Sequence, residues 1–190
     1  MKNLVKEVQA AEEELLVGNV ILYPTDTVWG IGCDAENAEA VKKIFKIKER
    51  EESKSMIVLV SDVEMLRRYI ENVPEGFEKL AESQERPTTF VLSGAKNLPK
   101  ELIAEDGSIG MRIAKDEFCH RLIQQIGRPL VSTSANVSGE PSPKAFSEIS
   151  ETIKERVDYV ALWRQDEEVE SRPSRIIKLD ESGRQTVIRD

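Results

Sequence analysis

The sequence predicts an α/β fold, a twisted mixed β-sheet flanked by helices, within one domain that covers residues 1–190. Short apolar runs that fit buried strands alternate with segments whose apolar residues recur at helical spacing. Two strand candidates also follow each other directly near each end of the chain, which indicates a sheet that is not purely parallel. A chain of 190 residues is long enough to bury the core of such a domain without disulfides or metal ions.

The helices are predicted from apolar periodicity and from the residues that end them. In the first helix, apolar residues from Leu4 to Leu16 recur at helical spacing, and Gly18 stands where a helix commonly ends. A later helix is ended by Gly127 and Pro129. We expect helices at residues 2–17, 38–48, 62–70, 75–84, 117–126 and 144–155.

The strands are predicted from short apolar runs that turn residues bound. The run from Val20 to Tyr23 is ended by Pro24, so the polar Thr25-Asp26-Thr27 loop follows the end of a buried strand, a favoured place for a ligand-binding loop. We expect strands at residues 20–23, 28–33, 56–60, 88–92, 108–113, 130–132, 159–162, 175–179 and 186–188.

The composition excludes several classes of protein. With 39% hydrophobic and 33% charged residues, the chain is neither disordered nor fibrous. Its net charge of −8 disfavours a nonspecific nucleic-acid coat or an anionic membrane surface as the main partner. Two distant cysteines and one histidine are too few for a zinc site, so we expect reduced thiols and no bound metal. The N-terminus lacks an apolar signal core and no run reaches the roughly 18 apolar residues of a spanning helix, so we expect a cytoplasmic protein.

The first motif that can carry chemistry runs from Pro24 to Gly32. It offers two hydroxyls and a carboxylate on a proline-ended turn, followed by Trp29 and two glycines that let a ligand approach the backbone. The pattern indicates a cradle for a small molecule. A turn that merely joins two strands, with Trp29 in the core, fits the same residues.

The second motif is a basic stretch within residues 42–54, where six cations face three glutamates. Lys48 and Arg50 lie two residues apart at the expected end of a helix, so both can converge on one polyanion such as phosphate. A solvated helix face with offsetting charges is the alternative.

The third motif, at residues 132–143, is a loop rich in hydroxyls and amides that can donate hydrogen bonds to phosphate or ribose oxygens. A plain loop of turn residues is the alternative. A serine nucleophile is disfavoured because the chain lacks a GxSxG motif and has His120 as its single imidazole.

Taken together and in this order, the three motifs resemble those of the YrdC family, whose members include the threonylcarbamoyl-AMP synthases. The segment from Pro24 to Gly32 is similar to the family's PTDTVYGLG-like loop, Lys48-Glu49-Arg50 to its KxR element, and Ser134-Ala135-Asn136 to its SxN element. The likeness covers nearly the whole chain. It implies a YrdC/RibB-like sheet around a basic cavity. It also implies a reaction that joins L-threonine, bicarbonate and ATP into threonylcarbamoyl-AMP and pyrophosphate, for the threonylcarbamoyladenosine modification of tRNA.

The resemblance also implies roles for individual residues. Lys48 and Arg50 are expected to stabilise the α-phosphate and the leaving pyrophosphate, Ser134 and Asn136 to supply oriented hydrogen bonds, and Mg²⁺ to screen the phosphates. The implied ATP contacts are Arg50, Lys54, Ser108, Asn136, Lys144 and Arg189. The implied threonine contacts are Thr27, Arg112, Ser134 and Ser174. The implied partners of the product are the proteins that transfer the threonylcarbamoyl group to tRNA.

Six positions depart from the family pattern. Three of the changes are tolerable: Trp29 stands where tyrosine is usual, Glu49 where a small residue is common, and Lys54 where asparagine is frequent. Leu59 stands where many synthases carry a histidine of the threonine pocket, Ala114 replaces the proline of an RxP element, and Lys144 replaces the threonine of an SPT element. These last three substitutions predict an altered threonine pocket.

Two other functions remain open on the sequence. One is a YrdC-like paralogue that binds double-stranded RNA, tRNA or a nucleotide without making the adenylate. The presence of the Ser134/Asn136 loop beside Lys48 and Arg50 favours the synthase, because an RNA binder needs cations but not an oriented Ser/Asn loop. The other is a carbamoyl-transfer accessory domain that has weak activity outside a larger complex.

Overall fold

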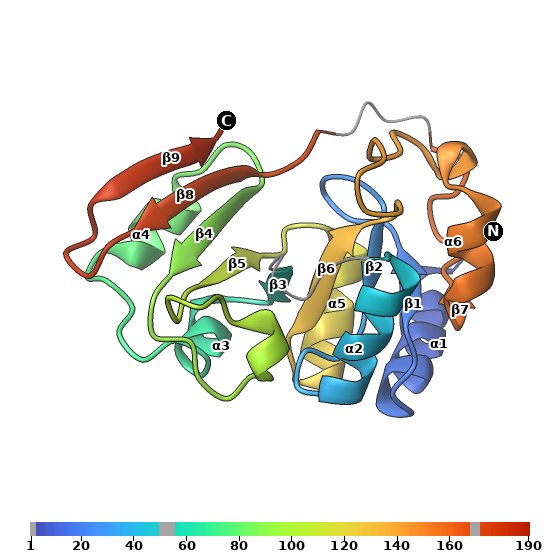
Figure 1. Ribbon diagram of the computed structural model, residues 1–190, viewed down its shortest axis with the longest axis horizontal. Helices are drawn as coiled ribbons and strands as arrows, with labels where there is room; N and C mark the ends of the chain where they lie inside the picture. The colour runs from blue at the N-terminus through green and yellow to red at the C-terminus, as the bar shows by residue number, and fades with distance from the viewer. Residues whose placement is uncertain (1–2, 50–55, 168–171) are drawn as a thin grey trace.

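The computed structural model describes residues 3–49, 56–167 and 172–190, and these form one mixed nine-stranded sheet (Figure 1). The strand order is β7-β1-β2-β6-β3-β5-β4-β8-β9. Three neighbouring pairs, β1/β7, β3/β5 and β4/β8, are parallel and the others are antiparallel, so the predicted mixed sheet is confirmed. The strands are β1 (Ile21–Tyr23), β2 (Gly30–Gly32), β3 (Ile57–Val60), β4 (Thr88–Leu92), β5 (Ile109–Ile113), β6 (Leu130–Ser134), β7 (Tyr159–Val160), β8 (Arg175–Leu179) and β9 (Gln185–Arg189).

Four of the helices in the described ranges begin at short polar residues that cap their free backbone N–H groups. Asn3, Asn37, Asp62 and Asp116 each accept such a hydrogen bond at the start of α1, α2, α3 and α5. Helix α5 ends at Gly127, whose φ of 67° is the left-handed conformation that glycine tolerates best. The helices are α1 (Leu4–Leu16), α2 (Ala38–Ile47), α3 (Val63–Arg67), α4 (Phe77–Glu82), α5 (Glu117–Ile126) and α6 (Glu151–Arg156), with short 3₁₀ turns η1 (Lys100–Leu102) and η2 (Phe146–Glu148).

The single helix expected at residues 144–155 is wrong. The structure instead has the short turn η2 and the helix α6, separated by Ile149 in an extended conformation. Ile149 and Ile153 are both buried, and their spacing of four residues fits a continuous amphipathic helix, which explains the error. The Glu148 carboxylate accepts a hydrogen bond from the Lys144 backbone N–H at 2.7 Å and stabilises the turn in place of a helix.

Both faces of the sheet are covered near β1, because Ile21, Leu22 and Tyr23 are all fully buried although successive side chains point to opposite faces. The ring of Tyr23 stacks on Phe118 of α5 and its hydroxyl donates to the Val131 carbonyl at 3.1 Å. This face of the sheet therefore meets α5, and the two helices α1 and α5 pack against each other (Figure 1).

Two further expectations concern cysteines and membranes. Cys33 and Cys119 are free and buried, as expected for reduced thiols, and burial raises the pKa of both. Within the three described ranges, no helix has the length and apolarity needed to cross a membrane.

Gly32 occupies a position with no room for a side chain. A Cβ built there lies 2.1 Å from the Val131 carbonyl oxygen and 2.7 Å from the ring of Tyr23. We therefore expect Gly32→Ala to lower the free energy of unfolding by about 3 kcal/mol or more, measured by urea denaturation. Gly107→Ala is the control, because that Cβ meets nothing within 4 Å and the cost comes only from its φ of 74°. An equal loss in both variants would contradict the steric argument.

Candidate active site

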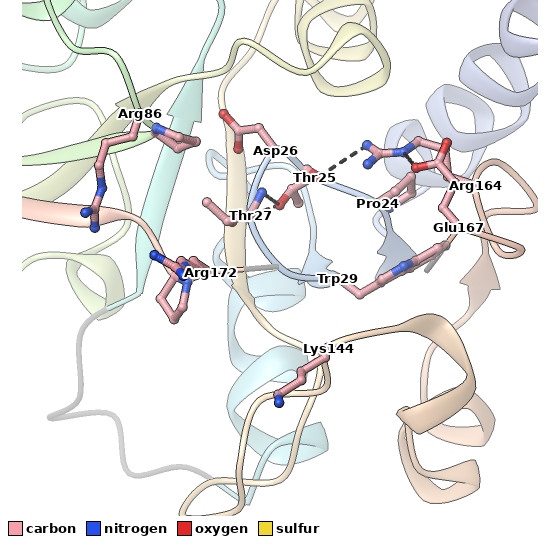
Figure 2. Close-up of a pocket in the computed structure, with 12 residues that line it drawn as sticks. Pro24, Thr25, Asp26, Thr27, Trp29, Arg86, Lys144, Arg164, Glu167 and Arg172 are labelled. Atoms are coloured by element: carbon pink, nitrogen blue, oxygen red, sulfur yellow. Dashed lines mark hydrogen bonds and ion pairs between the residues drawn. The ribbon is translucent and has the colours of Figure 1, made fainter. Parts of the chain in front are cut away.

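Two adjoining cavities lie where the Pro24–Thr27 turn meets the face of the sheet, and they share Thr27 and Pro173 as walls. The first cavity has a volume of about 340 Å³ and is the one drawn in Figure 2. The second has a volume of about 270 Å³ and extends across β2, β6, β3 and β5 toward β8. The charged residues that line the first cavity are Asp26, Arg86, Lys144, Arg164, Glu167 and Arg172.

Small side chains leave room for the second cavity on the sheet. Gly30 pairs with Ser134, Ile57 pairs with Ser132, and Ile57 also pairs with Gly110 on its other side, so these residues follow one another across the same face. Because the side chains of glycine and serine are small, they leave empty space over this face of the sheet. Ser132, Ser134 and Ile57 therefore line a hollow where larger residues would form ordinary core.

The Pro24–Thr27 turn, which lines the first cavity, is held in place by hydrogen bonds of its own hydroxyls. The Thr25 hydroxyl accepts from the Thr27 backbone N–H at 2.9 Å and donates to the Val28 carbonyl at 2.8 Å. The hydroxyls of Thr25 and Thr27 also lie 2.9 Å apart (Figure 2). The Thr27 oxygen is thus presented at a fixed position between both cavities.

Arg112 on β5 lies beneath this turn with only 2% of its side chain exposed. It donates from Nη1 to the Thr27 hydroxyl at 3.3 Å, and its Nη2 forms an ion pair with Asp26 at 3.1 Å. Nevertheless Nε and Nη2 of Arg112, and Oδ2 of Asp26, make no hydrogen bond to any described residue. Buried polar atoms without hydrogen-bond partners raise the free energy of the folded protein. A planar guanidinium with unused N–H donors can bind both oxygens of a carboxylate.

Ser174 and Arg189 form the opposite wall of the second cavity. Arg189 donates from Nε and Nη2 to the Ser174 carbonyl at 3.1 and 2.7 Å, and the Ser174 hydroxyl lies 2.8 Å from that of Thr89. Burial lowers the pKa of Arg189, and the neighbouring positive charges of Arg112 and Arg86 lower it further. The wall is therefore electropositive and suited to an anion.

The structure brings together three residues that were predicted to act together, Lys48, Ser134 and Asn136. The Lys48 side chain is buried at the end of α2 and its ammonium donates to the Ser134 carbonyl and, at 2.6 Å, to the Asn136 carbonyl. The Asn136 amide donates to the carbonyls of Val137 and Glu140, while its own Oδ1 is buried and accepts no hydrogen bond from the described residues. In this arrangement, Lys48 holds the Ser/Asn loop.

The remaining predicted residues are dispersed. Lys144 is exposed and lines the first cavity. Ser108 lies at the start of β5 and donates to Asp106 at 2.5 Å, a hydrogen bond that lowers the pKa of Asp106 to about 2; it lines neither cavity within the described chain. Arg50 and Lys54 lie outside the described residues.

Several cavity residues were not predicted from the sequence. Arg86, Arg164, Glu167 and Arg172 line the first cavity, but none belongs to a recognisable motif. Two of the residues that depart from the family pattern lie near Arg112: Leu59 is fully buried and pairs with Arg112 across β3 and β5, and Ala114 is buried directly after β5. Leu59 therefore presents an apolar surface beside the Arg112 backbone.

The chain's carboxylates offer no cage for a metal ion, since the described residues contain no group of three or more His, Cys, Asp or Glu side chains placed to hold one. Asp26 and Glu167, the two acids at the first cavity, both form ion pairs with arginines.

The chain is similar to a known protein family, to curated sequences and to solved structures. The model of the family Sua5/YciO/YrdC, described as "Telomere recombination", matches residues 13–190. A threonylcarbamoyl-AMP synthase of Pseudoalteromonas translucida is 36% identical over 155 residues, which are 80% of this chain and 83% of that protein.

Two solved structures are also similar. That of E. coli YciO has a TM-score of 0.83 and 25% identity, over 100% of this chain and 91% of that one. That of P. abyssi Sua5 complexed with L-threonine has a TM-score of 0.82 and 27% identity, over 94% of this chain but only 52% of that one. This chain thus spans about half the length of the P. abyssi protein. With a family model that matches nearly its whole length, the chain belongs to the Sua5/YciO/YrdC family.

Proposed function

We propose that this protein is a threonylcarbamoyl-AMP synthase, which joins L-threonine, bicarbonate and ATP and releases pyrophosphate. The observation that carries the proposal is the buried guanidinium of Arg112, which lines the second cavity together with Thr27 and Ser174 and has two nitrogens without a hydrogen-bond partner among the described residues. A buried fork of this kind suits the carboxylate of an amino acid. The similar P. abyssi protein was solved with L-threonine, which supports the choice of amino acid.

The first cavity suits the phosphates of ATP. Apart from Arg164, which is paired with Asp116 and Glu167, the basic side chains at this cavity are Arg86, Lys144 and Arg172, and both of its carboxylates are engaged by arginines. Arg86 and Arg172 lie on the side of the cavity opposite Glu167, and Lys144 lines a third side, with its ammonium directed away from the Thr25–Thr27 turn (Figure 2). Cations in such a setting neutralise the charge that develops on the α-phosphate and on leaving pyrophosphate.

The chemistry requires few covalent steps from the protein. The threonine amine attacks the carbon of bicarbonate with loss of water, or that of dissolved carbon dioxide with loss of a proton, and forms a carbamate. A carbamate oxygen then attacks the α-phosphorus of ATP while pyrophosphate leaves. Arg112, Thr27 and Ser174 hold the amino acid, and Lys48 keeps the Ser134/Asn136 loop in place beside it. Mg²⁺ bound to ATP would screen the phosphates. Catalysis is then mainly positioning and charge stabilisation.

The remaining parts of the proposal follow from this activity. The product would be consumed by proteins that transfer the threonylcarbamoyl group to tRNA, and the reaction would take place in the cytoplasm. A single domain stays a prediction, which the continuous sheet supports. The contacts of ATP with Arg50, Lys54 and Ser108 also stay predictions.

The proposal is tested by pyrophosphate release from purified protein with ATP, Mg²⁺ and bicarbonate. We expect release that depends on L-threonine and is much lower with L-serine or with no amino acid. Equal release under all three conditions, or none from folded protein, would refute the synthase.

A paralogue that binds a nucleotide or RNA without making the adenylate is the second candidate. The specific observation that favours it is Leu59, which replaces a polar pocket residue by a buried apolar one next to Arg112. ATP binding without threonine-dependent release would support this candidate.

A further inference from the structure

Three distant segments meet at the side chain of Arg164, which follows β7 and lines the first cavity. Its Nη1 donates to the Asp116 carboxylate at 2.6 Å and to the Thr25 carbonyl at 3.3 Å. Its Nε donates to Glu167 at 2.5 Å. Figure 2 shows the guanidinium directed at the turn that carries Thr25 and Thr27.

The backbone of Arg164 indicates that these contacts hold the residue in place. Its φ of 62° lies in the left-handed region that L side chains rarely adopt and that glycine tolerates. A strained conformation persists only where the surroundings stabilise it, and such residues gather at functional sites. The guanidinium supplies that stabilisation, because it donates to Thr25 and Asp116 on two distant segments and to Glu167 three residues along the chain.

The contacts continue from Arg164 to the amino-acid site without a gap. Arg164 holds the Thr25 carbonyl, the Thr25 hydroxyl accepts from the Thr27 backbone N–H, and the Thr27 hydroxyl accepts from Arg112. The preceding peptide is held as well, since the Cys119 thiol donates to the Pro24 carbonyl at 3.3 Å. The turn is thus fixed from outside by Arg164 and by α5, while its inner side faces Arg112.

We propose that Arg164 is a positioning residue, which holds the Thr25–Thr27 turn so that the Thr27 hydroxyl and the Arg112 guanidinium meet the amino-acid substrate in the correct geometry. The proposal rests on the proposed function, because it takes the second cavity as the amino-acid site. Arg164 itself touches the turn and not the reacting atoms. Without the hydrogen bonds of the Arg164 guanidinium, the turn can shift. Small displacements of this kind weaken the binding of the amino acid and slow turnover.

The test is a calorimetric titration with L-threonine, which does not depend on turnover. Arg164→Lys keeps a charge beside Asp116 but cannot bridge three acceptors. The double variant Asp116→Asn/Arg164→Gly relieves the strain at this φ, avoids an unpaired carboxylate and keeps a residue that caps α5 well. Arg121→Ala, which removes an exposed arginine on α5, and Lys46→Ala, which removes an exposed lysine on α2, are the controls.

We expect the Kd for L-threonine to rise about tenfold or more in both Arg164 variants, with unchanged stoichiometry. The controls should stay within about twofold of the original protein. In steady state, the same variants should show a raised KM for L-threonine, whereas partial unfolding would lower only the apparent kcat.

Two results would overturn the proposal. One is a Kd within about twofold of the original in either folded variant; the other is a reduced stoichiometry with unchanged Kd, which would make Arg164 purely structural. Failure of the unmodified protein to bind L-threonine refutes the proposed function instead and removes this proposal with it. Comparing the unmodified protein with its variants therefore distinguishes the two failures.

Discussion

Replacing Arg112 with alanine is expected to weaken L-threonine binding by about a hundredfold or more and to abolish threonine-dependent pyrophosphate release. The side chain is 2% exposed and two of its nitrogens lack hydrogen-bond partners among the described residues. Hydrogen bonds to charged groups contribute about 1.5–3 kcal/mol each, and a fork makes two of them with a carboxylate. Calorimetric titration with L-threonine measures the loss.

A second variant and a control separate binding from folding. Arg112→Ala leaves Asp26 without its ion pair, which itself destabilises the protein, whereas Arg112→Lys keeps a charge there and removes only the fork. Arg112→Lys should therefore fold and still bind at least about tenfold more weakly. Arg121→Ala, which removes an exposed arginine on α5, should bind normally. If folded Arg112→Lys bound L-threonine with normal affinity, Arg112 could not be the residue that binds the carboxylate of L-threonine with two hydrogen bonds.

Lys48→Met is expected to lower both stability and activity. The ammonium is buried and donates to the carbonyls of Ser134 and Asn136, and methionine fills a similar volume without donating. We expect the free energy of unfolding to fall by about 3 kcal/mol and turnover by about a hundredfold, because the Ser/Asn loop is no longer held. Urea denaturation and the pyrophosphate assay measure the two effects.

Lys46→Ala is the matched control for this prediction, because Lys46 is an exposed lysine on the same helix, two residues away. It should change neither stability nor turnover appreciably. A Lys48→Met protein of unchanged stability that loses only activity would contradict the loop-holding role and would favour direct contact of Lys48 with phosphate.

The fold could be predicted where a local pattern decided the structure. Helix α5 and strands β4 and β8 have the bounds expected from their sequences, because each combines a strong apolar pattern with clear end signals. The segment at residues 144–155 could not be predicted in this way. Its apolar spacing fits a helix, but Ile149 is drawn into the core in an extended conformation, a tertiary effect that local periodicity does not carry.

The site could be predicted in part. The expected threonine contacts Thr27, Arg112, Ser134 and Ser174 all line the second cavity, although they come from distant positions in the chain. Arg189, expected as an ATP contact, lines the same cavity. The position of the Lys48 ammonium was not predictable, because its acceptors are backbone carbonyls, which every residue has.

No motif and no spacing in the sequence indicated a role for Arg164. Its partners Thr25 and Asp116 lie 139 and 48 residues away, and its conformation is one that a sequence would suggest for glycine. Residues that act through long-range contacts with backbone groups become visible only in the folded structure.

The most direct test of the account is the mass of the nucleotide product formed from ATP, L-threonine and ¹³C-labelled bicarbonate. The account predicts threonylcarbamoyl-AMP that carries the label, with one pyrophosphate released for each product molecule. A folded protein that hydrolyses ATP to AMP without any labelled nucleotide, or that yields no nucleotide product, would contradict the synthase and with it the assignment of the second cavity to L-threonine.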